Sequence, residues 1–187
     1  MTGLWQLPAE VDLGGQIFGI RADYREILRV IACLEDPALP EQVRWLVALE
    51  LFYREPVPRQ LRREAMEYLA YFLTCGAEAA PGPKLLDWQQ DADAIIAGVN
   101  QAAGQEIRAL PFLHWWTFLG WFHTIGEGQL STRVAIRDRL ARGKPLEPWQ
   151  KEFYRENKHR VELRERLSPA QQAEKVRLEQ LLRGEKP

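Results

Sequence analysis

Three histidines, His114, His123 and His159, are the side chains of this sequence best suited to hold a metal ion or to transfer a proton. His114 and His123 lie nine positions apart, so at about 100° per residue they fall on opposite faces of one helix. Histidine pairs that bind a metal on a helix are about three or four residues apart. His159 lies in a charge-rich stretch. We therefore expect these histidines to be polar groups of the core or surface residues, and not ligands or bases.

The densest cluster of acidic side chains consists of Asp87, Asp91 and Asp93. On a helix, Asp87 and Asp91 would share a face one turn apart, where two carboxylates could hold a cation or a water molecule. Asp87 also lies near the start of the expected helix, where a carboxylate stabilises the helix dipole. We favour this structural interpretation, because no further acids follow at the spacing that a carboxylate metal site requires.

Glycine and cysteine motifs give no sign of catalysis. Gly126-Glu127-Gly128 ends an expected helix, whereas a phosphate-binding glycine motif opens a helix after a strand. The sequence contains no Gly-x-Ser-x-Gly and no Cys-x-x-Cys. Cys33 and Cys75 lie in apolar helical patterns, which indicates buried, reduced thiols. We expect a protein that is not an enzyme, with no catalytic residue, no metal and no cofactor.

The segment from Phe112 to His123 contains three tryptophans and three phenylalanines in twelve residues. Aromatic side chains bury the largest apolar areas, so this density indicates either the centre of a core or a groove for a partner. The segment lacks the Lys and Arg that accompany aromatics stacking on single-stranded nucleic acid. The expected helix of residues 111–125 would be roughly 22 Å long, too short to cross a bilayer. We favour the core and keep the partner groove as the alternative.

The elements before residue 77 are expected to form a hairpin and three helices. The hairpin, residues 11–20, would turn at Gly14-Gly15. Asp23 is a candidate helix cap, and Glu26 three positions later completes a capping-box pattern. Short connections favour an antiparallel bundle of the helices that the apolar spacing predicts over residues 24–34, 41–54 and 59–75, the last ended by Gly76.

The rest of the chain follows residues 77–83, the best candidate for a linker. After residue 147 the pattern is long, charged and sparsely apolar, which is typical of helices that extend from a domain or pack on a partner. The expected helices are 86–102, 111–125, 130–142 and, beginning at Ser168-Pro169, 169–183. The fold class is therefore all-α (mainly helical): a bundle with a short N-terminal β-hairpin and extended C-terminal helices, divided into residues 1–76, 77–145 and 146–187.

Charge is unevenly distributed along a chain whose net charge is −1. Residues 1–128 carry 10 basic and 17 acidic side chains, net −7, and residues 129–187 carry 15 and 9, net +6. This asymmetry could serve attraction between the two halves, self-assembly or an acidic partner. The signs are too mixed to indicate a nucleic-acid partner. The sequence also has no long apolar run and no secretion signal, so we expect no membrane contact and a cytoplasmic protein.

Three aromatic residues of the charged C-terminal region, Trp149, Phe153 and Tyr154, are the candidate contacts to a partner protein. Trp149 and Phe153 lie one helical turn apart and would form a compact apolar patch. The alternative is that these side chains dock on the core of the protein's own domain.

Four stretches of the sequence resemble a phage family. The first stretch, Leu86-Asp87-Trp88-Gln89-Gln90-Asp91-Ala92-Asp93-Ala94-Ile95-Ile96, is similar to an Asp-Phe-x-Gln-Asp-Ala motif. Leu113-His114-Trp115-Trp116-Thr117-Phe118 is similar to a His-Trp-Trp-x-Phe motif, and Ile136-Arg137 follows. Leu49-Glu50-Leu51-Phe52-Tyr53-Arg54-Glu55-Pro56-Val57-Pro58 is similar to the family's Leu-Phe-Tyr-Lys-x-Pro-Ile-Pro segment. Together they resemble the "gene product fifteen" family of tailed siphophages and prophages over about residues 5–140. The family-motif residues, which we interpret as structural, are Asp87, Asp91, His114, Trp115, Trp116 and Phe118.

The resemblance implies a tail-assembly chaperone in the cytoplasm of the host cell. Such a protein would bind the long, aggregation-prone tape-measure protein, keep it soluble, and leave as tail-tube protein polymerises. This interpretation also includes contacts to the tail-tube protein and to further copies of itself. The alternatives are a structural tail or head–tail connector component and, in a third class, a regulatory nucleic-acid binder that uses the basic C-terminal region.

Overall fold

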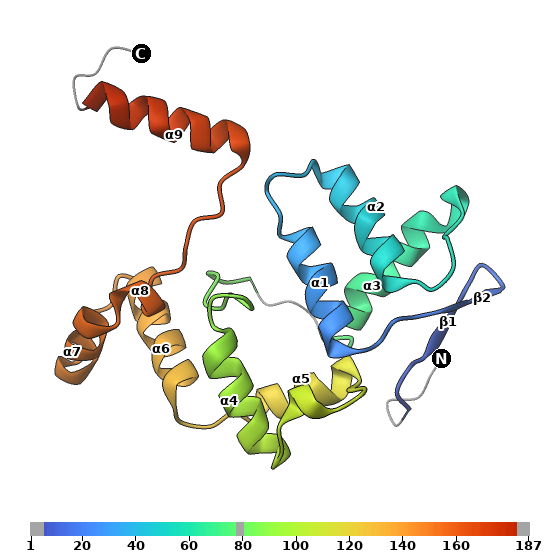
Figure 1. The fold of residues 1–187 in the computed structure, drawn as a ribbon, viewed down its shortest axis with the longest axis horizontal. Coiled ribbons are helices and arrows are strands. Elements are labelled where there is room, and N and C mark those ends of the chain that lie inside the picture. The colour runs from blue at the N-terminus through green and yellow to red at the C-terminus, as the bar shows by residue number, and fades with distance from the viewer. Residues whose placement is uncertain (1–5, 78–80, 183–187) are drawn as a thin grey trace.

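The computed structural model of the chain describes residues 6–77 and 81–182. Of the expected linker 77–83, residues 78–80 lie outside the described part. The described residues form one two-stranded hairpin, nine α-helices and two short 3-10 helices (Figure 1). The mainly helical fold class with an N-terminal hairpin is confirmed.

The elements are β1 Glu10–Leu13, β2 Gln16–Gly19, α1 Tyr24–Leu34, α2 Glu41–Phe52, η1 Arg59–Leu61, α3 Arg62–Leu73, α4 Ala92–Ala103, η2 Ile107–Ala109, α5 Trp115–His123, α6 Gln129–Ala141, α7 Pro148–Glu156, α8 Lys158–Val161 and α9 Pro169–Leu182.

The hairpin turns at Gly14 and Gly15 as expected. Both glycines have positive φ, 57° and 84°, and the antiparallel register pairs Leu13 with Gln16 on either side of the turn. A two-residue loop with two positive φ angles matches the twist of the strands, and glycine adopts it without steric cost. Alternation places Leu13 and Phe18 in the core and leaves Ile17 exposed. The hairpin therefore covers one side of the helical core.

Helix α1 begins at the expected cap. The Asp23 carboxylate accepts a hydrogen bond from the backbone N–H of Arg25 at 3.0 Å. The second half of the capping-box prediction is wrong, because the Glu26 carboxylate binds Arg29 at 3.0 Å. The cap is anchored instead across the fold, since Asp23 also accepts from the N–H of Leu113 at 3.0 Å.

Helix α4 begins at Ala92, and not at residue 86 as the apolar spacing predicted. Residues before it form turns, because the Asp87 carboxylate accepts hydrogen bonds from the N–H groups of Gln89 and Gln90, at 3.0 and 2.9 Å. Local bonds of this kind compete with helical hydrogen bonds. Asp87 therefore does not stabilise a helix dipole, and Asp87 and Asp91 do not share a face of one helix.

One apolar cluster occupies the centre of the molecule. Its buried side chains run from Leu13 in the hairpin to Leu130 in α6, so they come from both of the first two expected units. Helices α1 and α2 lie antiparallel on one side, and α4 and α5 lie on the other (Figure 1). The division at residue 77 therefore does not coincide with separate cores, and the division into folding units stays a prediction.

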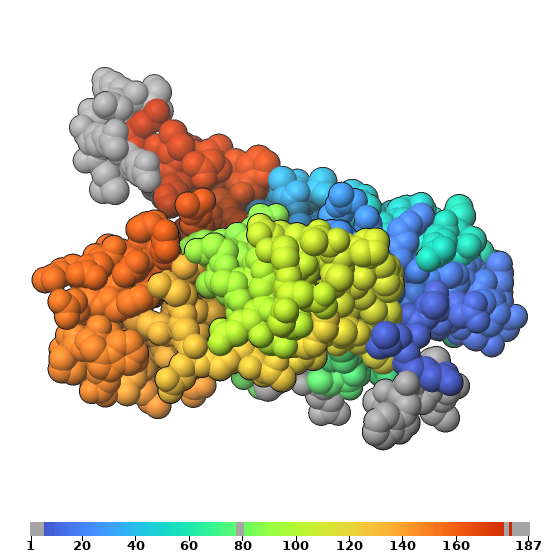
Figure 2. Space-filling view, turned by 60° about the horizontal axis from the view of Figure 1, so that its bottom comes forward, coloured from blue at the N-terminus to red at the C-terminus, as the bar shows by residue number. Residues whose placement is uncertain are grey.

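The C-terminal elements lie beside α6. Helix α8 packs on α6 and buries Val161, and α7 packs on α8. Helix α9 projects from the body of the molecule in both views (Figures 1 and 2), as expected of an extended C-terminal helix. Among the described helices, none is both long and apolar enough to cross a membrane.

Candidate functional site

The two adjacent tryptophans of α5 bind the end of α3. The indole N–H of Trp115 donates to the carbonyl of Leu73 at 3.1 Å, and that of Trp116 donates to the carbonyl of Phe72 at 2.9 Å. The last four carbonyls of a helix have no partner within the helix. The Trp–Trp pair supplies two of these partners while its rings stay in apolar contact with the core.

His114 completes the same motif at the start of α5. Its Nδ1 accepts a hydrogen bond from the N–H of Trp116 at 3.1 Å, so Nε2 carries the proton and donates to the carbonyl of Pro8 at 3.0 Å. Burial lowers the pKa of His114 below its ordinary value, and the bond to Pro8 only partly opposes this. His114 is a polar group of the core, as expected, whereas His123 and His159 are exposed.

Four aromatic side chains form a cluster of ring contacts, which we call the aromatic centre: Tyr24, Trp88, Trp115 and Phe118. Phe118 stacks on Tyr24 with ring centroids 4.9 Å apart and on Trp115 at 5.4 Å. Trp88 packs edge-on against Trp115 at 5.6 Å. The core interpretation of the aromatic segment is confirmed for Trp115 and Phe118, which are both buried. Phe112, at the edge of the segment, is exposed.

Asp91 lies at the centre of a buried ionic cluster, which we call the ionic junction: Asp91, Arg133 and Arg137. Arg137 forms a two-pronged pair with the Asp91 carboxylate at 2.6 and 2.9 Å, and Arg133 approaches it at 3.4 Å. All three side chains are buried. The carboxylate before α4 therefore pairs with Arg137 and shares Arg133 with Asp93, as charges removed from water require opposite partners.

The other two acids of the cluster also bind arginines. Asp93 accepts two hydrogen bonds from Arg133, at 2.9 and 3.0 Å, and these lower the pKa of Asp93 to about 2. Burial tends to raise the pKa of Asp87, but the backbone N–H groups it accepts from and the Arg166 guanidinium at 2.8 Å outweigh burial and lower it. The acidic cluster is thus used by internal ion pairs. Within residues 6–77 and 81–182, no group of three or more His, Cys, Asp or Glu side chains is placed to hold a metal ion.

A short C-terminal segment, residues 160–166, crosses the ionic junction, and we call it the strap. Arg137 donates to two of its carbonyls, that of Val161 at 2.6 Å and that of Arg160 at 2.8 Å. Arg137 also donates to the carbonyl of Leu85 at 2.9 Å. One guanidinium therefore connects α6 to the segment before α4 and to the strap.

Gln90 also binds the strap. Its amide donates to the carbonyl of Glu162 at 2.6 Å and accepts from the N–H of Arg164 at 3.0 Å. Together with Arg137, Gln90 attaches the basic half of the chain to the acidic half. Attraction between the halves, one of three explanations of the charge asymmetry, is present in the ion pairs of Asp91 with Arg137 and of Asp87 with Arg166.

The three candidate partner contacts of the C-terminal region differ in exposure. Trp149 is 55% exposed, and Phe153 and Tyr154 are half-buried. The Tyr154 hydroxyl donates to the Glu162 carboxylate at 2.5 Å, so this side chain is partly engaged by the protein's own strap. A role of these residues in binding a partner stays a prediction.

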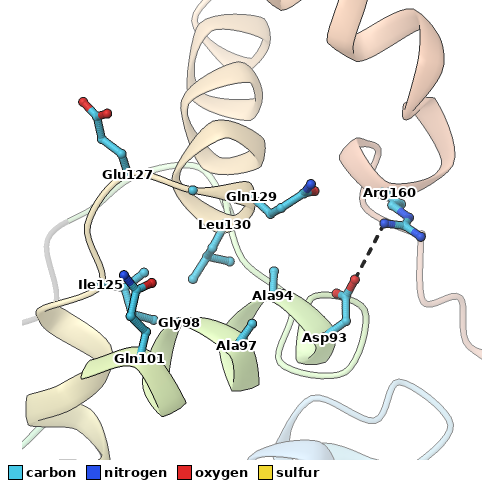
Figure 3. A pocket seen from close by; sticks show the side chains of 11 residues that line it. Asp93, Ala94, Ala97, Gly98, Gln101, Ile125, Glu127, Gln129, Leu130 and Arg160 are labelled. Atoms are coloured by element: carbon cyan, nitrogen blue, oxygen red, sulfur yellow. Dashed lines mark ion pairs between the residues drawn. The ribbon is translucent and has the colours of Figure 1, made fainter. Parts of the chain in front are cut away.

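A pocket of about 350 Å³ opens between α4 and the start of α6 (Figure 3). Its floor is made of small residues, Ala94, Ala97 and Gly98, and Asp93 points across one end toward Arg160, 3.9 Å away. Asp93 and Arg160 both contact the ionic junction already, Asp93 through Arg133 and the Arg160 carbonyl through Arg137. We assign the pocket no ligand.

Comparison with known proteins supplies the family. The sequence model of the family described as Bacteriophage Gp15 protein matches residues 5–163. The chain belongs to this family. No curated protein and no solved structure matches the chain. The match extends beyond the resemblance expected from sequence motifs, which ended near residue 140, and it includes α7, α8 and part of the strap.

Motif stretches of the Gp15 family that are far apart in the sequence meet in this fold. Trp88 packs on Trp115 and Phe118, and Asp91 binds Arg137. The partners Arg133, Arg137 and Gln90 were not identified as site residues from the sequence. A signal was present for the arginines, since they lie four residues apart on α6 among apolar positions, where a charge requires a buried partner.

Proposed function

We propose that this Gp15 family protein is a non-enzymatic tail-assembly chaperone that binds the tape-measure protein in the host cytoplasm. One observation carries the proposal beyond family membership. The polar edges of the family-motif residues are bound within the fold, while several large apolar side chains elsewhere remain exposed. A scaffold of this kind supports protein binding at its surface.

The proposed partner comes from the family resemblance, and the chemistry of the surface is compatible with it. A tape-measure protein is long and helical, and an amphipathic helix presents an apolar stripe that exposed apolar side chains can cover. Covering that stripe would keep the partner soluble until tail-tube protein replaces the chaperone. Replacement requires moderate affinity, which fits small exposed patches better than an extensive obligate interface.

Co-expression tests this function. The chain would be produced together with the protein encoded immediately downstream, and the soluble fraction of that protein would be compared with its fraction when expressed alone. We expect a very long helical protein that is soluble only with its partner. A soluble fraction that does not change would contradict the proposal.

Mass spectrometry of purified virions separates the chaperone from its main alternative. We expect the chain to be missing from finished particles. Stoichiometric presence would instead identify a structural tail or head–tail connector component.

A further inference from the structure

Helix α2 is apolar on almost every side, yet only part of it is covered. Ala48, Leu49 and Phe52 are buried in the core. Val43, Leu46 and Val47 lie on a different face and are 39%, 38% and 38% exposed. A helix that is apolar all round is normally covered on all sides. The exposed stripe therefore lacks a covering element among the described residues.

The stripe lies beside two adjoining hollows. One, of about 530 Å³, is lined by Trp45, Leu46 and Met66 together with charged residues of α2 and η1–α3. The other, of about 300 Å³, continues past Leu46 along Val47 and Val57. Leu46 and Arg62 line both hollows, so these join into one groove, which we call the α2 groove. Residues 41–50 along its wall span roughly 14 Å, or about three helical turns.

The two walls of the α2 groove carry opposite charges. Arg59 and Arg62 line the η1–α3 wall, and Glu41 and Glu50 line the α2 wall. None of these four side chains forms an ion pair or hydrogen bond within the part of the chain that the structure describes. Charges on the rim of an interface select the partner and its orientation.

Three other exposed apolar side chains are isolated from one another. Ile17, Phe112 and Leu140 lie on different elements, β2, the loop before α5 and α6. Single exposed apolar residues are common on soluble proteins. In the α2 groove, by contrast, the exposed Leu46 and Val47 line the hollow itself, and the exposed Val43 lies on the same face of α2.

We propose that the α2 groove binds an amphipathic helix of another protein, with an apolar stripe flanked by carboxylates on one side and by Lys or Arg on the other. The carboxylates face Arg59 and Arg62, and the basic flank faces Glu41 and Glu50. The assignment of a tape-measure helix as the natural occupant rests on the proposed function. A groove is concave and fits a convex ridge, whereas pairing with a second copy through the same patch would place groove against groove.

A designed peptide tests the groove directly. The probe is a fluorescently labelled 22-residue helix with leucines at a and d positions, glutamates on one flank and lysines on the other, and the control is a scrambled sequence of equal composition. Fluorescence anisotropy with the full-length protein should show saturable binding of the helix and much weaker binding of the scramble. Equal binding of both peptides would overturn the proposal.

A matched pair of variants locates the binding. Leu46→Glu should weaken peptide binding about tenfold or more, because it places a carboxylate in an apolar groove. Ile17→Glu makes a similar change at an exposed residue away from the groove and should leave binding unchanged. Circular dichroism and thermal melting confirm that both variants fold. Loss with Ile17→Glu, or no loss with Leu46→Glu, would contradict the assignment.

Charge reversal tests the orientation. The double variant Arg59→Glu, Arg62→Glu should weaken binding of a peptide that has glutamates on the flank facing these arginines and glutamines on the other flank. A peptide with lysines in place of those glutamates should bind the double variant more tightly than it binds the wild type. Failure of this exchange would overturn the proposed charge recognition.

Two further measurements separate the other possible occupants. If light scattering shows a dimer that Leu46→Glu dissociates, the groove is occupied by a second copy and the proposal is wrong. If Leu46→Glu abolishes peptide binding but still solubilises the downstream protein, the tape-measure helix is excluded as the occupant while the chaperone function stands. If the wild type solubilises nothing, the function fails and the peptide results alone decide the groove.

Discussion

The aromatic centre and the ionic junction hold the same fold together by different means. The aromatic centre joins α1, α5 and the turn before α4 through ring contacts. Phe118 of α5 packs on Tyr24 and Trp115, and Trp115 packs on Trp88. The ionic junction joins α4, α6 and the strap through Asp91 and Arg137. Apolar burial stabilises roughly in proportion to area and has little directional preference. Buried ion pairs require a particular partner at a particular place.

This difference determines how each region should respond to damage. Desolvation offsets much of the attraction within a buried ion pair, so the intact junction contributes little net stability compared with an apolar equivalent. Removal of one member nevertheless leaves another charge buried without compensation. The aromatic centre should lose stability gradually with lost contacts, whereas the ionic junction should fail when a single carboxylate is removed.

Asp91→Ala tests the junction most severely. It leaves Arg133 and Arg137 buried and without their shared carboxylate, and we expect a loss of about 3–5 kcal/mol in the free energy of unfolding. Urea denaturation measures the loss, and hydrogen exchange should show that α8 loses protection. Asp138→Ala is the control, because it removes a carboxylate of α6 whose partner Arg142 is 56% exposed, and we expect at most about 1 kcal/mol. Equal effects of the two variants would contradict the distinction.

Trp115→Phe and Trp116→Phe compare two donors within the same motif. Trp115→Phe removes the bond to Leu73 and part of a fully buried ring, with an expected loss of about 1–3 kcal/mol in the free energy of unfolding. Trp116 is only half-buried, so Trp116→Phe should cost about 1 kcal/mol. Chemical denaturation of both variants measures the difference. A larger loss for Trp116→Phe would show that stacking in the aromatic centre matters less than the helix-end bonds.

His114→Asn tests the pH dependence of the aromatic region. The folded pKa of His114 is lowered from 6.5, so the unfolded state binds more protons, and stability present above about pH 6.5 is lost as the pH falls toward the folded pKa. Asparagine can still cap α5 but does not titrate. The variant should be about 1–2 kcal/mol less stable at pH 8, through loss of the bond to Pro8, and this deficit should shrink as the pH falls to 5. Denaturation at several pH values measures the trend, and a constant deficit would refute it.

Gln90→Ala should give the smallest global effect, because it releases the strap without exposing a buried charge. We expect a change of about 1 kcal/mol or less in the free energy of unfolding, and faster hydrogen exchange at the N–H of Arg164. Trypsin should also cleave more readily after Arg164 and Arg166. Gln90→Glu keeps the acceptor for Arg164 but loses the donor to Glu162, so its effect should be intermediate. Unchanged exchange in Gln90→Ala would show that Arg137 alone holds the strap.

The parts that local chemistry decides were predictable from the sequence. Gly14-Gly15 marked the hairpin, Asp23 marked the start of α1, and the density of aromatics marked Trp115 and Phe118 as core. Each of these signals depends on neighbouring residues or on helical spacing. The predicted start of α4 was wrong, because the apolar pattern suited a longer helix. The hydrogen bonds that Asp87 accepts from the N–H groups after it hold those residues in turns instead.

By itself, the sequence determined the mainly helical class, the hairpin, the aromatic core and the family resemblance, because these follow from short-range spacing and composition. Only the tertiary structure decided that Trp115 and Trp116 bind the end of α3, that Arg137 is the partner of Asp91, and that one face of α2 is uncovered. The physical reason is distance along the chain. A buried charge or an unpaired carbonyl requires a partner, but elements tens of residues away supply it, and the fold alone shows which ones.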